Sequence, residues 1–455
     1  MTVECAVVLF NRDLRVEDHP GLGDAVRSAR FVVPLFVLDD QILSGAHSAP
    51  NRLAFLLDCL ADLRASLRDR GGDLVVTRGD AVEETMRIAL RYGAGAVHVS
   101  ADVSRHAARR EARLAAACEQ QRIAFSSSPG VTVVPPGQLR PTGGDHYRVF
   151  TPYWNQWRAT KWRNPAPAPA VVRLPPDLAV GEIPTLADLT SEPPSPELCV
   201  GGEAVGRALL RSWSDSELGQ YGDRHDDLPG DGTSRLSPYL HFGCVSPLET
   251  ALRCGERSGG EPFVRQLCWR DFHHQVTASF AAIATDDYRS RGDRWRRSAS
   301  DLEAWQLGRT GYPIVDAGMR QLRQVGWMHN RARMITASFL TKHLYIDWRL
   351  GAAHFMRWLV DGDIANNSGN WQWVAGTGND TRPNRVLNPM RQAERFDPSG
   401  DYVRRYIPEL AGVDGASVHR PWELDPDRRA LLDYPAPIVD LAAAAAGFRQ
   451  ARGAV

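Results

Sequence analysis

The sequence predicts a Rossmann-like α/β domain with a parallel sheet, joined by a long connector to a mostly α-helical domain. Over residues 3–130, short β-branched runs alternate with longer amphipathic stretches, as in parallel α/β domains. Beyond residue 201 the strand signals end and helical periodicity takes over. At 455 residues the chain is also too long for one core of ordinary size. We therefore expect domains at 1–130 and 201–455, with a connector at 131–200.

The expected elements of the first domain follow from the spacing of its apolar residues. Runs rich in Val, Ile and Leu predict strands at 3–9, 31–38, 73–77 and 96–100. Apolar residues at helical spacing predict helices at 52–70, 81–92 and 105–121. The domain contains neither a GxGxxG nor a GxxxxGK[ST] phosphate loop. Any ligand is therefore expected at the carboxyl ends of the strands.

Prolines mark the connector, and tryptophans mark the helical domain. Alternating prolines run over 165–169, and a second cluster lies at 193–196. All 13 tryptophans lie beyond residue 150, and ten of them lie beyond residue 200. Packing explains any single tryptophan of a large helical domain. An ordinary core, however, rarely needs so many.

The composition is that of an ordinary globular protein, with 43% hydrophobic and 24% charged residues. The formal net charge is zero, so the total charge does not demand a nucleic-acid partner. The longest apolar runs fall far short of the about 18 residues of a membrane helix. The stretch at 6–10 predicts a first strand rather than a signal peptide, so we expect a cytoplasmic protein. Seven cysteines without a CxxC pair predict neither a metal site nor a disulfide framework.

The segment at 232–238 (GTSRLSP) has the residues of a helix start. Backbone N–H groups, hydroxyls and the Arg235 guanidinium at such a place suit a pyrophosphate. An ordinary helix N-cap is the alternative interpretation of the same residues.

The segment at 266–274 (QLCWRDFHH) predicts a helix. Helical spacing places Gln266, Trp269, Arg270 and His273 on one face. An amide, an indole and a guanidinium side by side would recognise a flat polar ring. The histidine pair is more typical of packing or of a surface than of a metal site.

The segment at 327–339 (WMHNRARMITASF) aligns Asn330, Arg333 and Met334 on one helical stripe, with a polar head and an apolar base. A lone methionine at such a place usually belongs to a core. A functional role therefore depends on what faces the stripe.

The segment at 361–373 (DGDIANNSGNWQW) is the densest in polar and aromatic residues. Helical spacing puts Asp363, Asn367 and Trp371 on one stripe, while Trp373 points elsewhere. Burying such a patch costs free energy unless partners satisfy its polar groups. A bound polar aromatic cofactor is the natural explanation.

Taken together, TSRLSPYL, WRDF, WMHNRARMITASFL and DGDIANNSGNWQW resemble the photolyase/cryptochrome flavoprotein family. The residues Arg12-Asp13-Leu14-Arg15 resemble that family's N-terminal signature. The resemblance spans the whole chain and is strongest to class I cyclobutane pyrimidine dimer photolyases. It implies a light-driven enzyme that repairs UV-damaged DNA as a monomer. It also implies that 201–455 binds FAD and that 1–130 binds an antenna chromophore.

The resemblance assigns FAD contacts to residues of all these motifs. Arg333 and Asp361 match an ion pair beside the isoalloxazine ring, and Asn367 matches the position that faces flavin N5. The complete set of FAD contacts that the resemblance implies is Tyr221, Thr233, Ser234, Arg235, Leu236, Ser237, Trp269, Arg270, Arg333, Asp361, Asp363 and Asn367.

An electron chain and a lesion pocket are also implied. Trp371, Trp348 and Trp295 match the three tryptophans that conduct an electron from the surface to the flavin. Indole faces can stack on a dimer flipped out of the duplex, for which photolyases are a standard example. The residues that match the lesion pocket are Gln266, Trp269, Asn330, Met334 and Trp373. Those expected to hold DNA phosphates are Arg331, Lys342, Arg382 and Arg385.

One position departs from the pattern. Gln266 stands where cyclobutane-dimer photolyases of this class usually have Glu, and Asp271 shortens the neighbouring acid. An amide is neutral but can still donate a hydrogen bond. Glutamine here resembles the (6-4) photolyases, whose histidine pair is replaced in this chain by residues including Met334. Cyclobutane-dimer repair is the prediction, and a (6-4) photolyase or a cryptochrome photoreceptor without repair activity are the alternatives.

The antenna prediction depends on the start of the helix after the fourth strand. Folate-binding members carry Asn-Glu there, whereas this chain has Ser104-Arg105. We therefore expect an 8-hydroxy-5-deazaflavin near Arg12, residues 36–39 and Arg52, with methenyltetrahydrofolate or an empty site as alternatives. No extended tail follows the last motif, which favours an enzyme over a photoreceptor.

Overall fold

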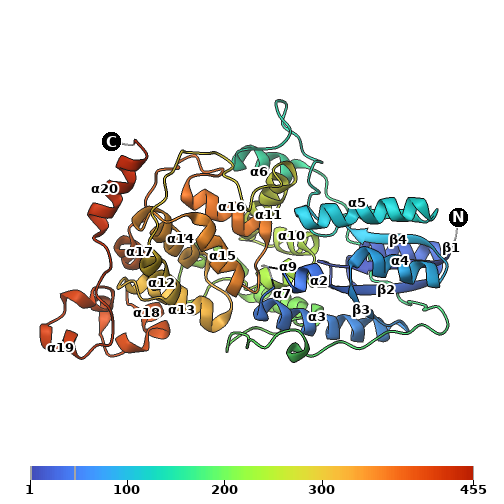
Figure 1. The fold of residues 1–455 in the computed structure, drawn as a ribbon, viewed down its shortest axis with the longest axis horizontal. Coiled ribbons are helices and arrows are strands. Elements are labelled where there is room, and N and C mark those ends of the chain that lie inside the picture. Colours follow the sequence, from blue (N-terminus) through green and yellow to red (C-terminus); the bar gives the residue numbers. More distant parts are fainter. Residues whose placement is uncertain (1–2, 46–47, 454–455) are drawn as a thin grey trace. The chain divides into compact units, whose positions relative to one another are not determined.

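The computed structural model describes residues 3–45 and 48–453, which form two compact units (Figure 1). The segments of the first unit are Met1–Pro194, Cys199–Gly219 and Ser234–Ala282. Those of the second unit are Ser195–Leu198, Gln220–Thr233 and Ile283–Val455. The first helices beyond residue 200 thus pack with the α/β domain. The functional boundaries expected at residues 130 and 200 remain a prediction.

Five strands form one parallel sheet in the first unit. They are β1 Val3–Phe10, β2 Ala29–Asp39, β3 Val75–Gly79, β4 Ala94–Ser100 and β5 Ala124–Ser128. Their order in the sheet is β3-β2-β1-β4-β5, with Val7 of β1 opposite Val33 of β2 and Val97 of β4. The chain therefore winds outward from β1 in both directions, which is the Rossmann-like pattern. The predicted α/β fold is confirmed.

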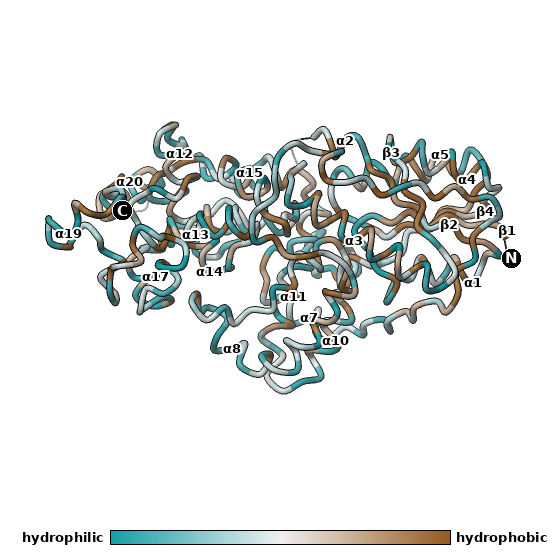
Figure 2. Tube along the Cα trace, turned by 90° about the horizontal axis from the view of Figure 1, so that it is seen from below, coloured by the Kyte–Doolittle hydropathy of each residue, from teal (hydrophilic) through white to brown (hydrophobic). Residues whose placement is uncertain are grey.

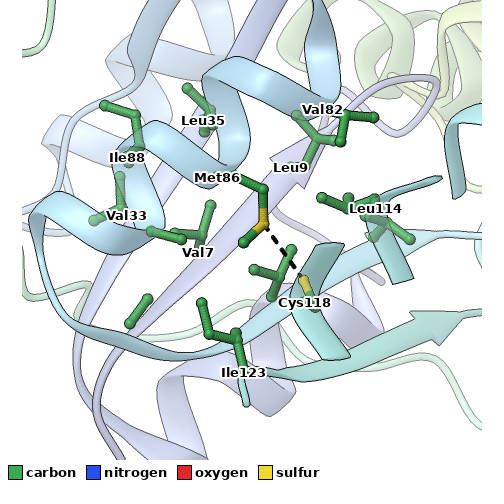
Figure 3. Packing of buried hydrophobic residues seen from close by; sticks show 14 of the residues in the cluster. Val7, Leu9, Val33, Leu35, Val82, Met86, Ile88, Leu114, Cys118 and Ile123 are labelled. Carbon is green, nitrogen blue, oxygen red and sulfur yellow. Dashed lines mark hydrogen bonds between the residues drawn. The ribbon is translucent and has the colours of Figure 1, made fainter. Parts of the chain in front are cut away.

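Successive residues of β1 face opposite layers, because side chains alternate along a strand. Cys5, Val7 and Leu9 lie in a buried cluster with residues of α4 Ala81–Arg91 and α5 Arg105–Gln120 (Figure 3). Phe10 instead contacts His19, whose ring caps α1 Pro20–Ser28. The remaining helices of this part are α2 Asp40–Leu43 and α3 Pro50–Arg68.

Three elements of the α/β domain were not predicted, one of which is the single helical turn α2. The strand β5 was not predicted, since its sequence AFSSS has no alternation of apolar and polar residues. The helix α1 was not predicted either, because nine residues that include two glycines give a weak helical signal. The strand β5 and the helix α1 both depend on the sheet against which they pack.

The motif after β1 ties the rest of the first unit to the sheet. Arg12 Nε donates to the His241 carbonyl at 3.1 Å, and Arg15 Nη1 donates to the Gly243 carbonyl at 2.8 Å. Gly243 has φ +71, and a Cβ there would meet the Arg12 carbonyl oxygen at 2.0 Å. The helices of this part are α6 Phe150–Ala159, α7 Glu203–Ser216, α9 Ser237–Phe242, α10 Pro247–Gly255 and α11 Glu261–Ser279.

The described residues of the second unit form helices and connecting loops and contain no strand, as predicted. Its α-helices are α8 Tyr221–Arg224, α12 Ala299–Leu307, α13 Pro313–Val325, α14 Asn330–Ser338, α15 Trp348–Trp358, α16 Ile364–Ala375, α17 Pro389–Phe396, α18 Asp401–Tyr406, α19 Pro426–Ala430 and α20 Leu441–Ala451. A π-helical turn at Phe339–His343 continues α14. The helices α13 and α16 both pack against α14, and α15 packs against α16.

The hydropathy of the chain follows this architecture. Figure 2 shows hydrophobic residues along the strands of the sheet and alternating character along the helices that cover it. Within residues 3–45 and 48–453, no helix is both long and apolar enough to cross a membrane.

Candidate active site

A partly buried ion pair connects α14 to the turn before α16. Arg333 Nη2 donates to Asp361 Oδ2 at 2.8 Å, and Arg333 Nε donates to the Met328 carbonyl at 2.8 Å. The Asp361 side chain is only 4% exposed. The expected pair is therefore present, while its place beside FAD remains a prediction.

The second oxygen of Asp361 has no partner among the described residues. Asp361 Oδ1 is buried and accepts no hydrogen bond from the described residues. A buried carboxylate oxygen without a donor costs free energy, so a ligand N–H group is a natural partner for this atom.

Asp363 has a different role, because it caps α16. Its Oδ1 accepts hydrogen bonds from the Asn366 backbone N–H at 2.7 Å and from the Asn366 amide at 2.8 Å. The cap fixes the first turn of α16. Asp363 thereby helps to hold Asn367 in place, since Asn367 follows Asn366 directly in the helix.

Asn367 is held with its amide oxygen available. Its Nδ2 donates to the Ala352 carbonyl at 3.1 Å, on α15. This bond settles which end of the amide is nitrogen, because only an NH₂ group can donate to a carbonyl. The Oδ1 atom accepts no hydrogen bond from the described residues and can accept one from a ligand.

These side chains fit a flat polar cofactor. The unpartnered Oδ1 atoms of Asp361 and Asn367 are acceptors, and the Arg333 guanidinium is a cation next to the first of them. A bound ring system with N–H donors and carbonyl oxygens would satisfy all three groups. The donor and acceptor set therefore suits the isoalloxazine of FAD.

Trp371 packs closely against α15 because Gly351 of that helix has no side chain. The indole is 3% exposed, and its ring centroid lies 4.9 Å from that of Phe355. A Cβ at Gly351 would meet Cη2 of Trp371 at 2.2 Å. Gly351 lies one turn beyond Trp348 on α15, so only glycine at this position lets Trp371 approach the helix that Trp348 begins.

The other two tryptophans of the expected chain are also in the second unit. Trp348 is fully buried, and its Nε1 donates to Asp287 at 2.9 Å. Trp295 is half-buried, and its ring lies 5.1 Å from that of Tyr345. The three indoles thus run from buried to partly exposed, and their role in electron transfer remains a prediction.

A further tryptophan near Trp371 was not predicted. Trp305 is fully buried on α12, and its ring centroid lies 6.0 Å from that of Trp371. Its Nε1 donates to the Thr336 carbonyl at 3.0 Å. The residue lies 66 positions before Trp371 in the chain, so no local spacing connects the two.

Two lesion-pocket candidates follow the expected helical stripe of α14. Asn330 is exposed and Met334 is half-buried. Trp373 on α16 is also half-buried, unlike the neighbouring Gln372, which is fully buried. The Gln372 amide donates to the carbonyls of Ile283 and Asp286. The alternation separates Trp371, inside the unit, from Trp373, at its surface.

The expected phosphate contacts differ among themselves. Arg331 binds both oxygens of Asp226, and its guanidinium lies over the ring of Phe396. It is therefore already paired within the second unit. Arg382 is exposed, and no described residue forms an ion pair with it. Arg382 is therefore better placed than Arg331 to bind a phosphate.

The prediction for Lys342 is wrong. Its side chain is 1% exposed, and its ammonium donates to the carbonyls of Pro383 and Arg385. Burial lowers the pKa of Lys342 to about 7. The lysine therefore holds the loop that carries the exposed Arg385 and does not itself reach solvent. The sequence alone could not show that this lysine is buried and not at the surface.

In the first unit, α11 carries the remaining lesion-pocket candidates. Gln266 is exposed and Trp269 is half-buried one turn later. The indole of Trp269 stacks on Phe150 of α6, with ring centroids 3.6 Å apart. Phe150 was not predicted, since it lies in the connector and follows no periodic pattern.

The next two residues of α11 attach this helix to the segment at 131–134. Arg270 donates to the carbonyls of Val131 and Leu240. Asp271 Oδ2 accepts from the backbone N–H groups of Val133 at 3.0 Å and Val134 at 2.9 Å, and from Trp157 Nε1 at 2.9 Å. Burial raises the pKa of Asp271 to about 6. These contacts are structural, and an FAD contact of Arg270 remains a prediction.

The expected phosphate-binding segment at 232–238 begins in the second unit and continues in the first from Ser234 onward. Arg235 adopts φ +52, a conformation that is rare for residues other than glycine. Ser234 Oγ accepts from the Leu236 N–H at 3.3 Å, and Leu236 is buried. Ser234, Arg235, Leu236 and Ser237 belong to the first unit, and Tyr221 and Thr233 belong to the second. Their contacts to FAD remain predictions.

Polar residues gather at the carboxyl ends of the strands, where the antenna was expected. Asp39 ends β2, caps α2 and lies 3.2 Å from His106 Nε2. Arg12 follows β1 and pairs with Asp102, which follows β4, at 3.3 Å. Ser104 caps α5, so it occupies the helix start where folate-binding proteins have another residue pair.

Comparisons with known proteins agree with this architecture. Residues 6–171 match the family model described as DNA photolyase, and residues 263–453 match the FAD binding domain of DNA photolyase. A deoxyribodipyrimidine photo-lyase of Streptomyces griseus is 56% identical, with 98% of this chain and 99% of that protein covered. A protein named cryptochrome DASH, from Natronomonas pharaonis, is 37% identical, with 96% and 98% covered.

Solved structures of related proteins share the whole fold. A bacterial class III photolyase from Agrobacterium tumefaciens has a TM-score of 0.92 at 33% identity, covering 100% of this chain and 98% of its own. An archaeal photolyase from Sulfolobus tokodaii, described as having two FAD molecules, which imply a novel light-harvesting cofactor, has a TM-score of 0.88 at 31% identity. That match covers 99% of this chain and 100% of the other.

The fold and the site therefore define a flavoprotein with a photolyase-type FAD-binding domain. The chain belongs to the photolyase/cryptochrome family. The predicted DNA photolyase-type enzyme with an FAD-binding domain is confirmed at this level. Lesion, antenna and the roles of individual residues stay predictions.

Proposed function

We propose that the protein repairs cyclobutane pyrimidine dimers in DNA under blue light. The observation that carries this proposal is the arrangement around Asn367. Its amide nitrogen donates to the Ala352 carbonyl, which leaves its oxygen as an acceptor for a ligand in the unit that also contains the Arg333–Asp361 pair. Bound FAD would supply the light absorption and the electron that splits the dimer. The chain would bind and orient both cofactor and lesion.

The second unit would hold the isoalloxazine. Asn367 Oδ1 would accept a hydrogen bond from the N–H of a reduced flavin, and Asp361 Oδ1 would accept another. Arg333, whose guanidinium pairs with Asp361, would offset negative charge on the ring. Tyr221, Thr233, Ser234, Arg235 and Ser237 would bind the phosphates and their surroundings.

Three tryptophans would return the cofactor to its reduced form. An electron would pass inward from Trp295 at the surface to Trp348, then to Trp371, and from there to the flavin. Their exposure supports this direction, because Trp295 is the only half-buried one of the three. Indoles suit this work because they are oxidisable and chemically robust.

A flipped dimer would be held by stacking and amide contacts. In the first unit, Trp269 offers a half-buried indole and Gln266 an exposed amide. In the second unit, Trp373 and Asn330 offer the same two kinds of group. Exposed arginines such as Arg382 would hold phosphates without reading sequence. The stripe of Asn330 and Met334 on α14 favours cyclobutane dimers, because no histidine pair occupies it.

For the antenna we propose an 8-hydroxy-5-deazaflavin at the carboxyl ends of the strands. The start of α5 argues against folate, since Ser104-Arg105 stands where folate-binding members carry Asn-Glu. Asp39, His106, Arg12 and Asp102 provide hydrogen-bonding groups for a polar ring at this edge.

The test is the absorbance spectrum of the purified protein, followed by blue-light repair of two oligonucleotides under reducing conditions. One oligonucleotide contains a cyclobutane dimer and the other a (6-4) photoproduct. We expect flavin bands and repair of the first lesion alone. Flavin bands without repair of either lesion would instead favour a cryptochrome, and Gln266→Glu would then show whether the amide suppresses repair.

A further inference from the structure

Two buried cysteines of the first unit lie with their sulfur atoms in contact. Cys59 of α3 and Cys244, which follows the glycine at the end of α9, have Sγ atoms 3.2 Å apart. Both side chains are fully buried, and both are thiols in this structure. Since the S–S bond of a disulfide is about 2.05 Å long, the two sulfurs need to approach by only about 1.2 Å to form one.

Aromatic packing holds the two elements that carry these thiols together. Phe55 lies one turn before Cys59 on α3, and its ring centroid is 5.3 Å from that of Tyr239 and 4.9 Å from that of Phe242, both on α9. The Phe242 carbonyl in turn accepts from the backbone N–H of Leu14 at 3.2 Å. The sulfurs therefore meet because α3 and the end of α9 are both fixed in the same unit.

The segment before α7 covers Cys59 with backbone and not with side chains. A Cβ at Gly201 would meet the Cys59 sulfur at 2.8 Å, and the Gly201 N–H donates to Asp58 Oδ2 at 3.1 Å. The backbone N–H of Gly202 forms a hydrogen bond to the Cys59 sulfur. A donor aimed at this sulfur favours the thiolate, which is the form that reacts in thiol oxidation and disulfide exchange.

A third thiol lies near this pair, closer to solvent. Cys199 is half-buried, and the carbonyl of the next residue, Val200, accepts from the Tyr239 hydroxyl at 2.8 Å. Burial raises the pKa of Tyr239, and three neighbouring thiols raise it further. These thiols are those of Cys199, Cys244 and Cys59. A bond to Cys199 is therefore the competing arrangement for either member of the pair.

We propose that Cys59 and Cys244 are a redox-sensitive pair, which a hydroperoxide converts to a disulfide bond. The proposal does not depend on FAD or on the lesion. In the first step, one thiol sulfur is oxidised to a sulfenic acid, while the O–O bond of the hydroperoxide breaks and an alcohol, or water in the case of hydrogen peroxide, leaves. In the second step, the other thiol attacks this sulfur, so that the S–S bond forms and water is released.

The resting state and the product are both stable. Burial raises the pKa of Cys59 well above its usual range, so this thiol keeps its proton at neutral pH and its oxidation is slow. The pair therefore survives brief exposure to an oxidant. Once the bond has formed, packing keeps the two sulfurs together, and a small thiol cannot easily reach either of them.

The bond would connect distant parts of the chain. Cys59 and Cys244 lie 185 positions apart, so the disulfide would close a long loop that includes the strands β3, β4 and β5. A cross-link restricts the unfolded state, and a longer loop gives a larger effect. We therefore expect the oxidised protein to resist unfolding better than the reduced protein does.

The test is treatment of the full-length protein with hydrogen peroxide, followed by peptide mapping under non-reducing conditions by mass spectrometry. We expect a cross-linked pair of peptides that contains Cys59 and Cys244. We also expect unfolding of the first unit at a higher urea concentration, and dithiothreitol should reverse both effects. In Cys244→Ser both effects should be absent. Cys254→Ser is the matched control and should behave like the wild type, because Cys254 is another fully buried thiol of the first unit.

Two results would overturn the proposal. One is a cross-link of Cys59 or Cys244 to Cys199, which would show that a different pair is the one that oxidises. The other is full alkylation of both cysteines when the peroxide-treated protein is unfolded in iodoacetamide, which would show that both remain thiols. Both results come from the wild-type protein, so they can be read even if Cys244→Ser does not fold.

Discussion

The indole of Trp269 lies flat on the ring of Phe150, with centroids 3.6 Å apart and planes within 3° of parallel. Phe272 and His273 of α11 also contact the same indole. One face of Trp269 is therefore covered by Phe150, and the rest of the indole is held by its own helix. A side chain that is fixed in this way loses little further conformational entropy when a base stacks on it.

We predict that Phe150→Leu weakens binding of dimer-containing DNA by about 0.5–1.5 kcal/mol, the contribution of an aromatic pair. The reason is that Trp269 loses the ring that supports it. Fluorescence anisotropy with damaged and undamaged oligonucleotides measures the effect. Phe55→Leu is the control, since Phe55 is an equally buried ring of the same unit that does not contact Trp269. An equal loss in both variants would assign Phe150 to general stability.

We predict that Trp371→Phe blocks photoreduction of oxidised flavin but leaves repair by chemically reduced enzyme largely intact. Phenylalanine fills most of the volume beside Gly351 but is much harder to oxidise than an indole. Flavin absorbance during blue-light illumination measures the first property, and dimer repair measures the second. Trp305→Phe is the control, because Trp305 is a buried neighbour of Trp371 outside the proposed chain. Photoreduction that survives Trp371→Phe would remove this residue from the chain.

We predict that Trp373→Ala weakens binding of dimer-containing DNA by about 1–3 kcal/mol, the usual range for one base stacked on an aromatic side chain. Binding of undamaged duplex should change little, because no base is flipped there. Trp358→Ala is a matched control, as Trp358 is another half-buried indole of the second unit. Unchanged affinity for the damaged strand would exclude Trp373 from the lesion pocket.

We predict that Asp271 makes the folded protein less stable as the pH rises from 4 to 6. Burial raises the pKa of Asp271 from 3.8 to about 6, so the folded state binds more protons than the unfolded state in this window. A shift of this size corresponds to on the order of 3 kcal/mol. In Asp271→Asn this share of the pH dependence should vanish.

Urea unfolding of both proteins at several pH values measures this difference. Asp316 of the second unit also has a pKa raised by burial to about 6, so it contributes a background that is the same in the two proteins. Identical pH profiles for the wild type and Asp271→Asn would show that the carboxyl of Asp271 has an ordinary pKa.

Several parts of the fold could be predicted because they depend on local patterns. Each of the four expected strands overlaps a strand of the sheet, since buried parallel strands are continuous apolar runs. The helical motifs around Trp269, Arg333 and Asn367 lie on α11, α14 and α16 as expected. Predictions of this kind need only the spacing of residues within one element.

Contacts between distant segments could not be predicted. Phe150 supports Trp269 from more than a hundred residues away, and Gly351 admits Trp371 from a different helix. Lys342 carries a cationic group of the kind that binds DNA phosphates, but its side chain is buried in the core. Asp293 and Arg452 pair across most of the second unit.

The sequence by itself determined the class of fold, the order of the motifs and the kinds of side chain that the motifs contain. Backbone hydrogen bonding and the burial of apolar stripes impose these patterns within a single helix or strand. Only the tertiary structure decided which atoms of those side chains remain free to act. Packing leaves the Asn367 oxygen without a donor among the described residues, encloses the Lys342 ammonium between carbonyls, and sets the Tyr345 hydroxyl against Asp293. Such pairings depend on where separate elements meet, and the spacing of residues within one element does not predict them.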